Sequence, residues 1–214
     1  MDRKEIEEAV KKVLSTTKKR KFTQSIDLAI NLSLEAKDQP KLDEIIELPK
    51  GRIKQAKVGA FVATELKDQA QKICDHTVLS DNFDQWTDPR KIKKFLRTYD
   101  FFIAQATIMP QVAQVFGKYL GPLGKMPNPK AGQIVPPKAN LTPLIKKLKN
   151  SIRLTLKKSP VVHCSVGNEK MSPADITENI LAILDTLKTK LPRGQHSISS
   201  IYLKTTMGPG VKLQ

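Results

Sequence analysis

The chain is poor in the residues that build metal and redox sites. Two cysteines, Cys74 and Cys164, and three histidines occur among its 214 residues, and they are not closely spaced. A tetrahedral metal site needs ligand pairs a few residues apart, so we predict no metal site, two buried thiols and ordinary histidines. Sparse cysteines outside any disulfide framework are typical of a reducing compartment, which predicts a cytoplasmic protein.

Long apolar runs are also missing. No segment approaches the ~18 uninterrupted apolar residues that a membrane span needs. Residues 1–14 alternate charged and hydrophobic positions and lack the apolar core of a signal peptide. We therefore expect neither secretion nor a membrane partner.

Motifs of nucleotide-binding and hydrolytic enzymes are absent. The loop at residues 121–126 invites comparison with the phosphate loop GxxxxGK[ST], but Met126 stands where the metal-binding hydroxyl belongs. The patterns GxGxxG, GxSxG and HExxH do not occur. We predict no catalytic residues, no cofactor and no enzymatic activity. A basic α/β enzyme that uses phosphorylated substrates stays open as an alternative.

Acidic residues are absent from the segment between Phe101 and Asn168. The chain as a whole is strongly basic, with 37 Lys and Arg against 21 Asp and Glu. That segment carries ten cations: Lys118, Lys125, Lys130, Lys138, Lys146, Lys147, Lys149, Arg153, Lys157 and Lys158. Solvated surfaces usually mix both signs, so a field of one sign favours a partner rich in phosphates. A solvated helix end is the alternative for the lysines at 146–149, and a DNA-associated architectural protein is the alternative to an RNA-binding one.

Aromatic residues make up 5% of the chain. Proteins that bind single strands stack bases on exposed rings, so this shortage favours folded RNA, which is read through phosphates, 2′-hydroxyls and shape. Residues 21–25 and 204–208 offer the Lys, Ser, Thr and backbone groups for such contacts. Structural alternatives exist for single residues: Phe22 in the core, Ser25 in a turn and Thr206 as a β-former.

The two ends of the chain share the period of half-buried strands and amphipathic helices. The strand-like segments are 26–32, 45–48, 154–156, 161–166 and 198–204, and the helix-like segments are 2–14 and 173–187. Each end alone would make a thin core. We therefore predict that residues 1–63 and 154–214 combine into one α+β domain.

The middle of the chain has a different hydrophobic pattern. Continuous apolar runs at 58–62, 77–79 and 101–106 alternate with segments of helical spacing. Asp88 and Pro89 are typical of an N-cap and a first helical position. Buried runs between helices indicate βαβ units and a parallel sheet. We predict a doubly wound α/β domain inserted at residues 64–153.

The most unusual segment is LGPLGKMPNPKAG at residues 120–132, a stiff loop of prolines and glycines that bears two lysines. KFTQSIDLAINL stands near the start and SIYLKTTMGPGVKL at residues 200–213. These three motifs, in this order, resemble the L-one family of large-subunit ribosomal proteins, which form the mobile stalk beside the tRNA exit site, in its archaeal form. The resemblance covers essentially the whole chain.

The resemblance implies a split α+β terminal domain of ferredoxin- or RRM-like form and an inserted Rossmann-like α/β domain joined by a hinge. The partners that it implies are large-subunit rRNA within the large ribosomal subunit, tRNA leaving the exit site, and the mRNA of its own operon, whose translation family members repress. We expect a monomer when the protein is free of the ribosome.

The resemblance also implies the RNA-binding residues. Carried over by motif, they are Lys21, Phe22, Ser25, Asp27, Lys157, Lys158, Ser159, His163, Gly167, Ser200, Lys204, Thr206, Met207 and Gly208. We expect Ser25 and Thr206 to contact 2′-hydroxyls or phosphates while Phe22 and Met207 exclude water from those bonds. Pro160 departs from the family pattern, because that turn often ends in Thr-Gly and proline has no amide donor.

Overall fold

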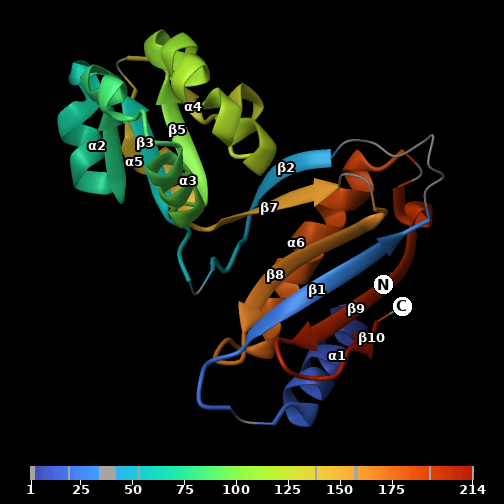
Figure 1. Cartoon of the computed structure of the whole chain (residues 1–214). Helices are drawn as coiled ribbons and strands as arrows, with labels where there is room; N and C mark the ends of the chain where they lie inside the picture. The colour runs from blue at the N-terminus through green and yellow to red at the C-terminus, as the bar shows by residue number, and fades with distance from the viewer. Residues whose placement is uncertain are drawn as a thin grey trace. The chain divides into compact units, whose positions relative to one another are not determined.

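The computed structural model describes residues 3–18, 20–33, 42–52, 54–137, 139–156, 159–192 and 194–213. The chain forms two compact units, which Figure 1 shows with their elements labelled. Met1–Lys54 together with Ser151–Gln214 make the terminal unit, and Gln55–Asn150 make the inserted unit. Both ends of the chain therefore contribute to one unit.

A four-stranded antiparallel sheet forms the centre of the terminal unit. Its strands, in spatial order, are β10 (Val211–Lys212), β9 (Ile198–Thr205), β1 (Ser25–Leu32) and β8 (Val161–Asn168). The early strand β1 thus lies between two strands from the C-terminal part of the chain (Figure 1). A separate antiparallel pair joins β2 (Leu42–Glu47) to β7 (Ser151–Leu156).

Two helices cover one face of this sheet. Helix α1 (Arg3–Thr16) buries Ile6, Val10 and Val13, and helix α6 (Pro173–Lys190) buries a longer apolar stripe in the same core. Every second residue of β1 is buried, from Ile26 to Leu32, because those side chains point at the helices. The alternate residues are half-buried on the opposite face, which is the open face of the sheet.

The inserted unit contains a parallel sheet with helices between its strands. The strands, in spatial order, are β4 (His76–Leu79), β3 (Val58–Val62), β5 (Phe101–Gln105) and β6 (Ile134–Val135). The helices are α2 (Lys67–Ile73), α3 (Pro89–Thr98), α4 (Met109–Leu123) and α5 (Leu141–Lys149). All residues of β3 and β5 are buried, as a strand covered on both faces must be. The predicted mixture of α/β and α+β structure is present.

Short 3-10 helices complete the described elements: η1 (Thr64–Leu66), η2 (Ser80–Gln85), η3 (Ala106–Ile108), η4 (Pro129–Ala131) and η5 (Gly194–Ser197). The two-residue strands β6 and β10 were not predicted, because two residues are too few to show a period. Helix α3 begins at Pro89 with Asp88 as its N-cap, as predicted, and the Asp88 side chain accepts from the Arg90 amide at 2.9 Å.

The boundary between the units differs from the predicted one. The prediction placed residues 58–62 in the terminal domain and residues 151–153 in the inserted one. Strand β3 instead pairs with β4 and β5, so it lies in the inserted unit. Strand β7 begins at Ser151 and pairs with β2, so all of it belongs to the terminal unit. Strand partners are set by tertiary pairing, which the local pattern does not contain.

The proline-glycine loop has a structural role in the inserted unit. Gly124 ends α4 with φ 68°, a left-handed conformation that suits glycine. The Lys125 ammonium then donates to the carbonyl oxygens of Leu96 and Tyr99, at the C-terminal end of α3. Lys125 therefore neutralises the negative end of that helix instead of offering its charge to a phosphate.

Candidate nucleic-acid interface

The start of β1 and the segment after β9 meet at one corner of the terminal sheet. Ser25 donates its backbone N–H to Thr206 Oγ1 at 3.1 Å, and its carbonyl oxygen accepts from the Thr206 N–H at 3.0 Å. The two side-chain oxygens lie 3.0 Å apart. We call this pair the Ser25–Thr206 clamp, because it connects the two ends of the chain by backbone and side-chain bonds.

The clamp leaves hydrogen-bonding capacity on Ser25 in particular. A hydroxyl has one donor and two acceptor positions. Thr206 Oγ1 accepts from the Ser25 amide and has the Ser25 carbonyl, at 3.3 Å, and the Ser25 hydroxyl as further partners, so its capacity is largely used. Among the described residues, Ser25 Oγ bonds only to Thr206, which leaves two of its positions for a ligand. Thr206 thus positions the hydroxyl that Ser25 offers.

Gln24 connects this corner to the chain before β1. Its side chain is buried, donates to the Lys18 carbonyl at 3.1 Å and accepts from the Met207 N–H at 3.2 Å. The backbone at Met207 is therefore held while its side chain is 62% exposed, and the Phe22 side chain is 50% exposed. Two large apolar side chains near a polar corner are unusual on a soluble surface and favour a contact surface.

Gly208 is required by the packing beneath the clamp. A Cβ at this position would lie 2.2 Å from Thr205 Oγ1 and 3.2 Å from Thr17 Oγ1. Those two hydroxyls are bonded to each other at 3.0 Å, and Thr205 is fully buried. A Cβ at Gly167 would likewise lie 3.0 Å from Met171 Sδ. Both glycines therefore shape the corner by leaving room for their neighbours.

A groove of 420 Å³ lies beside the clamp. It is lined by five residues from positions or segments that were predicted for the site, Phe22, Thr23, Ser25, Gly167 and Thr206, and by six that were not, Leu48, Arg52, Lys54, Ser165, Val166 and Asn168. Arg52 and Lys54 supply positive charge to the groove. Arg52 and Lys54 were not predicted from the sequence, because residues 49–51 were interpreted only as the end of a strand. The two cations Lys50 and Arg52, separated by one glycine, were the signal that could have identified them.

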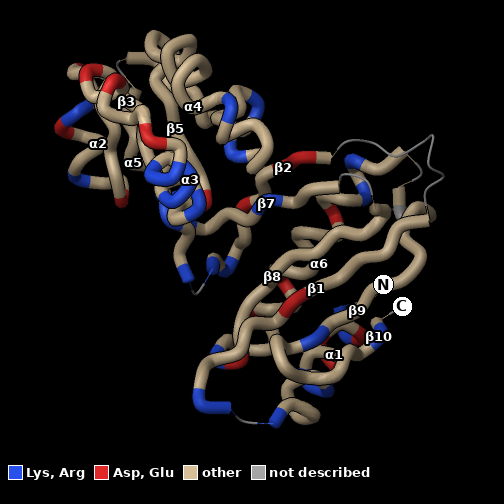
Figure 2. Tube along the Cα trace, viewed as in Figure 1, with Lys and Arg blue, Asp and Glu red and all other residues tan. Residues whose placement is uncertain are grey.

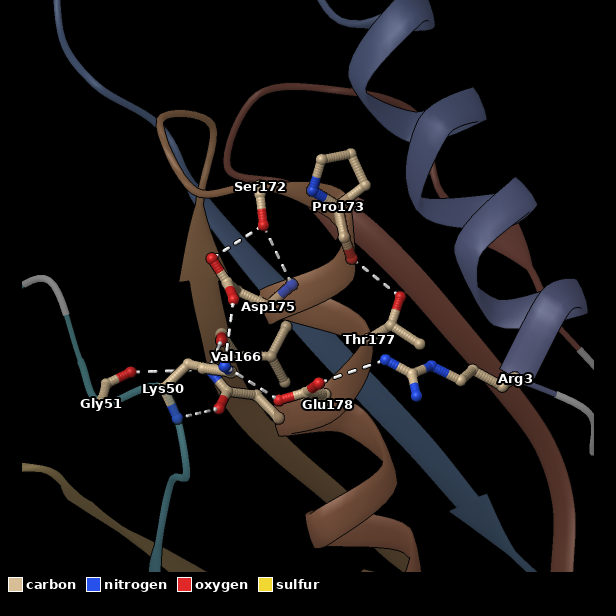
Figure 3. Close-up of polar contacts among 10 residues, drawn as sticks. Arg3, Lys50, Gly51, Val166, Ser172, Pro173, Asp175, Thr177 and Glu178 are labelled. Atoms are coloured by element: carbon tan, nitrogen blue, oxygen red, sulfur yellow. Dashed lines mark hydrogen bonds and ion pairs between the residues drawn. The ribbon is translucent and has the colours of Figure 1, made fainter.

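Ion pairs hold the turn that carries Arg52 against α6 (Figure 3). The Lys50 ammonium lies 3.3 Å from a Glu178 carboxylate oxygen and 3.6 Å from an Asp175 one. The bond to Glu178 raises the pKa of Lys50, so the lysine keeps its charge. Arg3 of α1 also binds Glu178, at 3.1 Å. Both helices of the terminal unit thus contribute to this network.

Asn179 connects the same turn to the sheet. It is fully buried, accepts from the Lys50 amide at 3.1 Å and donates to the Val166 carbonyl at 2.9 Å (Figure 3 draws this region). Val166 and Arg52 both line the groove. A buried amide therefore sets the distance between two of its walls. Asn179 gave no signal in the sequence, because a polar residue on a helix usually faces water.

The remaining predicted residues on strands lie along the open face of the sheet. Asp27 pairs in register with Lys204 on one side and Ser165 on the other, next to the clamp. His163 pairs with Ala29, two residues further along β1. These positions continue the polar surface away from the groove.

Ser200 and Ser159 lie further from the clamp. Ser200 pairs with Asn31 and accepts from its side-chain amide at 2.9 Å. Ser159 is exposed in the turn before β8, and the next residue, Pro160, accepts from the Leu32 amide at the far end of β1. Lys21 is exposed beside Phe22 and does not line the groove. Lys157 and Lys158 lie outside the described residues.

A comparison with known proteins identifies the family. Residues 13–209 match the model of the Ribosomal protein L1p/L10e family. The chain belongs to this family. It is 41% identical to large ribosomal subunit protein uL1 of Pyrococcus abyssi, over an alignment that covers 100% of this chain and 97% of that protein. Identity is 41% to uL1 of Methanothermococcus thermolithotrophicus and 42% to uL1 of Methanocella arvoryzae, with 100% of each chain covered.

Membership in the L1p/L10e family confirms the resemblance to the L-one family in its archaeal form. Proteins of this family have a structural role, so the chain is not an enzyme. The alternative of a basic α/β enzyme is thereby set aside. Among the helices that the structure describes, none is long and apolar enough to cross a membrane.

Of the residues described here, no three among His, Cys, Asp and Glu lie close enough together to hold a metal ion. Burial raises the pKa of the Cys74 thiol to about 11 and that of Cys164 to about 12. Both thiols therefore stay protonated at neutral pH, and a protonated thiol is a poor nucleophile.

Proposed function

We propose that this chain is a structural protein of the large ribosomal subunit in the cytoplasm, and that its terminal unit binds large-subunit rRNA at the groove beside the Ser25–Thr206 clamp. One observation carries the proposal: the groove combines the Ser25 hydroxyl, which has open bonding positions, with two cations and an exposed aromatic ring. Family membership supplies the class of partner.

The chemistry of the groove suits folded RNA. Ser25 Oγ offers bonds to a 2′-hydroxyl or a phosphate oxygen, and the 2′-hydroxyl is the group that distinguishes RNA from DNA. Arg52 and Lys54 attract the backbone, and Lys204 adds charge next to Asp27. We expect the exposed side chains of Phe22 and Met207 to exclude water from these bonds in the complex, which strengthens them. Recognition here depends on shape and backbone more than on base edges.

The finer roles are proposals of the same kind. We propose that the protein binds at the mobile stalk, assists the movement and release of tRNA at the exit site, and represses its own operon by binding the mRNA. A groove that reads backbone shape accepts any RNA with the same fold, which supports a shared site for rRNA and mRNA. We assign the terminal unit to the split ferredoxin- or RRM-like domain and the inserted unit to the Rossmann-like one.

Filter-binding titrations of the full chain against fragments of large-subunit rRNA test the site. Ser25→Ala removes the free hydroxyl and keeps both backbone bonds to Thr206, so we expect affinity to fall about fivefold to tenfold, as for the loss of one hydrogen bond. Ser199→Ala, an exposed serine on β9, is the matched control and should bind as the parent does. Equal loss in both variants would refute the assignment of the site.

Competition tests the class of partner. At one fixed salt concentration, the rRNA fragment and the operon mRNA should displace each other, while duplex DNA of equal length should compete weakly. Crosslinking in intact large subunits should recover peptides around Phe22 and Met207 joined to rRNA. Equal competition by duplex DNA would favour the architectural DNA-binding alternative.

A further inference from the structure

Helix α3 concentrates positive charge on the inserted unit. Half of its ten residues are cations: Arg90, Lys91, Lys93, Lys94 and Arg97. All five are exposed, and Figure 2 shows the gathering of Lys and Arg on α3. In the part of the chain that the structure describes, none of the five forms an ion pair. Uncompensated charge of this density favours an anionic partner.

Aromatic rings line a hollow of 490 Å³ against this helix. The lining consists of His76, Gln85, Trp86, Lys91, Lys94, Phe95, Thr98 and Tyr99. The rings of Trp86 and Phe95 lie 4.8 Å apart between centroids, and those of Phe95 and Tyr99 lie 5.1 Å apart. The centroid of the His76 ring lies 5.0 Å from that of the Phe95 ring. These four side chains are partly or fully exposed, so their rings form a surface on which a further ring can stack.

The few aromatic residues of the chain are distributed unevenly between the two units. All of them except Phe22 and Tyr202 lie in the inserted unit. The 5% average therefore hides a local concentration, and the argument against base stacking applies to the terminal unit only.

A second hollow, of 480 Å³, continues the surface. It is lined by Arg90, Lys93, Lys94, Arg97 and Thr98. Lys94 and Thr98 line both hollows, so the basic one and the aromatic one adjoin at these two residues. Cations beside a cluster of aromatic rings match the alternation of phosphate and base along a nucleic-acid strand. An acidic peptide would use the cations and leave the aromatic hollow without a partner.

We propose that the inserted unit carries a second RNA site, in which an unstacked base enters the aromatic hollow and the neighbouring phosphates contact the cations of α3. This site uses no residue of the groove in the terminal unit. The proline-glycine loop supports it, because Lys125 holds the carbonyls of Leu96 and Tyr99 at the end of α3. The most characteristic motif of the sequence thus positions the helix that binds the RNA.

The chain's single tryptophan makes the test specific. Trp86 lines the aromatic hollow, so its fluorescence responds to a ligand that enters the hollow. The full chain is titrated with single-stranded oligoadenylate of about ten nucleotides, a length within the usual range for such sites. We expect saturable quenching as a base stacks near Trp86. Absence of quenching would overturn the proposal.

Charge variants with a matched control locate the phosphates. Lys91→Gln combined with Lys94→Gln should raise the Kd about tenfold at low salt and lower the salt slope by about 1.4, because each phosphate contact to a single strand contributes about 0.7. Lys67→Gln combined with Lys72→Gln removes the same charge from exposed positions of α2. If this control weakens binding as much, the charge acts only as a general field and the site is refuted.

Two further titrations separate this proposal from the alternatives and from the proposed rRNA site. Polyglutamate should leave the Trp86 signal unchanged; quenching as strong as with oligoadenylate would assign the surface to an acidic protein segment and overturn the RNA proposal. Thr206→Val should weaken binding to rRNA fragments and leave the Trp86 titration as it was. A result that refutes the site in the inserted unit therefore differs from a result that refutes the rRNA site in the terminal unit.

Discussion

Ser25 and Thr206 stand 181 positions apart in the sequence, and their hydroxyl oxygens lie 3.0 Å apart in the structure. Strand β1 pairs with β9 from Ile26 to Leu32, and the clamp extends that pairing to Ser25, one residue beyond the end of β9. The same contact therefore stabilises the sheet and forms the corner of the groove. Substitutions at the clamp should affect both properties, to different extents.

Thr206→Val tests the two roles of the clamp. The variant loses the acceptor for the Ser25 amide and the side-chain bond, so we expect the free energy of unfolding of the terminal unit to fall by about 1 kcal/mol, since the site is exposed and water replaces part of the loss. Urea denaturation measures the change, and filter binding should show weaker rRNA affinity. Thr206→Ser keeps the hydroxyl and should restore both; a Val variant with parental affinity would remove Thr206 from the site.

Gly208→Ala tests the packing beneath the clamp. The added Cβ would lie 2.2 Å from the buried Thr205 hydroxyl, so the bond between Thr205 and Thr17 must break or the turn must move. We expect a loss of about 1–3 kcal/mol in the free energy of unfolding. Gly210→Ala is the matched control, because a Cβ there meets nothing within 4 Å. Equal stability of the two variants would contradict the prediction.

Arg52→Gln tests the charge of the groove. The guanidinium donates to the Ser151 carbonyl at 3.3 Å and has donors left for a phosphate. We expect the slope of log affinity against log salt to fall by about 0.9, which corresponds to one phosphate contact. Lys212→Gln, on the edge strand β10, makes the same change in charge and should reduce the slope less than Arg52→Gln does. Identical slopes would show that the charge of Arg52 acts without contact.

Lys125→Met tests the role of the proline-glycine loop. The ammonium group binds two carbonyls at the end of α3, and charged hydrogen bonds of this kind contribute about 1.5–3 kcal/mol. We expect the variant to lower the unfolding temperature of the inserted unit and to weaken oligoadenylate binding, measured by calorimetry and Trp86 fluorescence. Lys130→Met, at an exposed position of the same loop, should leave the unfolding temperature unchanged.

Alkylation of the two thiols should depend steeply on pH. Burial raises the pKa of Cys74 to about 11 and that of Cys164 to about 12, from the usual 9.0. Because the thiolate is the reactive form, the rate of iodoacetamide labelling of the folded chain should rise about tenfold per pH unit from about pH 7 to about pH 9. Unfolding in urea should accelerate labelling about 100-fold or more at about pH 8 by restoring the ordinary pKa. Mass spectrometry of the labelled peptides measures both rates.

Local patterns were sufficient for much of the fold. The alternation from Ile26 to Leu32 predicts β1 and its buried face, and Asp88 with Pro89 predicts the start of α3. These features depend on residues within one or two turns of each other, so the local sequence contains them. The unit boundary depended on which strands pair with β3, and that information is not local.

The sequence by itself determined the family, through three motifs, and the excess of positive charge that indicates a phosphate-rich partner. Only the tertiary structure decided which cations are available: Lys125 is turned inward onto backbone carbonyls, whereas Arg52 lines the groove. It also decided that the scarce aromatic rings gather beside α3. Charge and composition are sums over the chain, but binding depends on which groups face the same space, and chain folding alone brings them there.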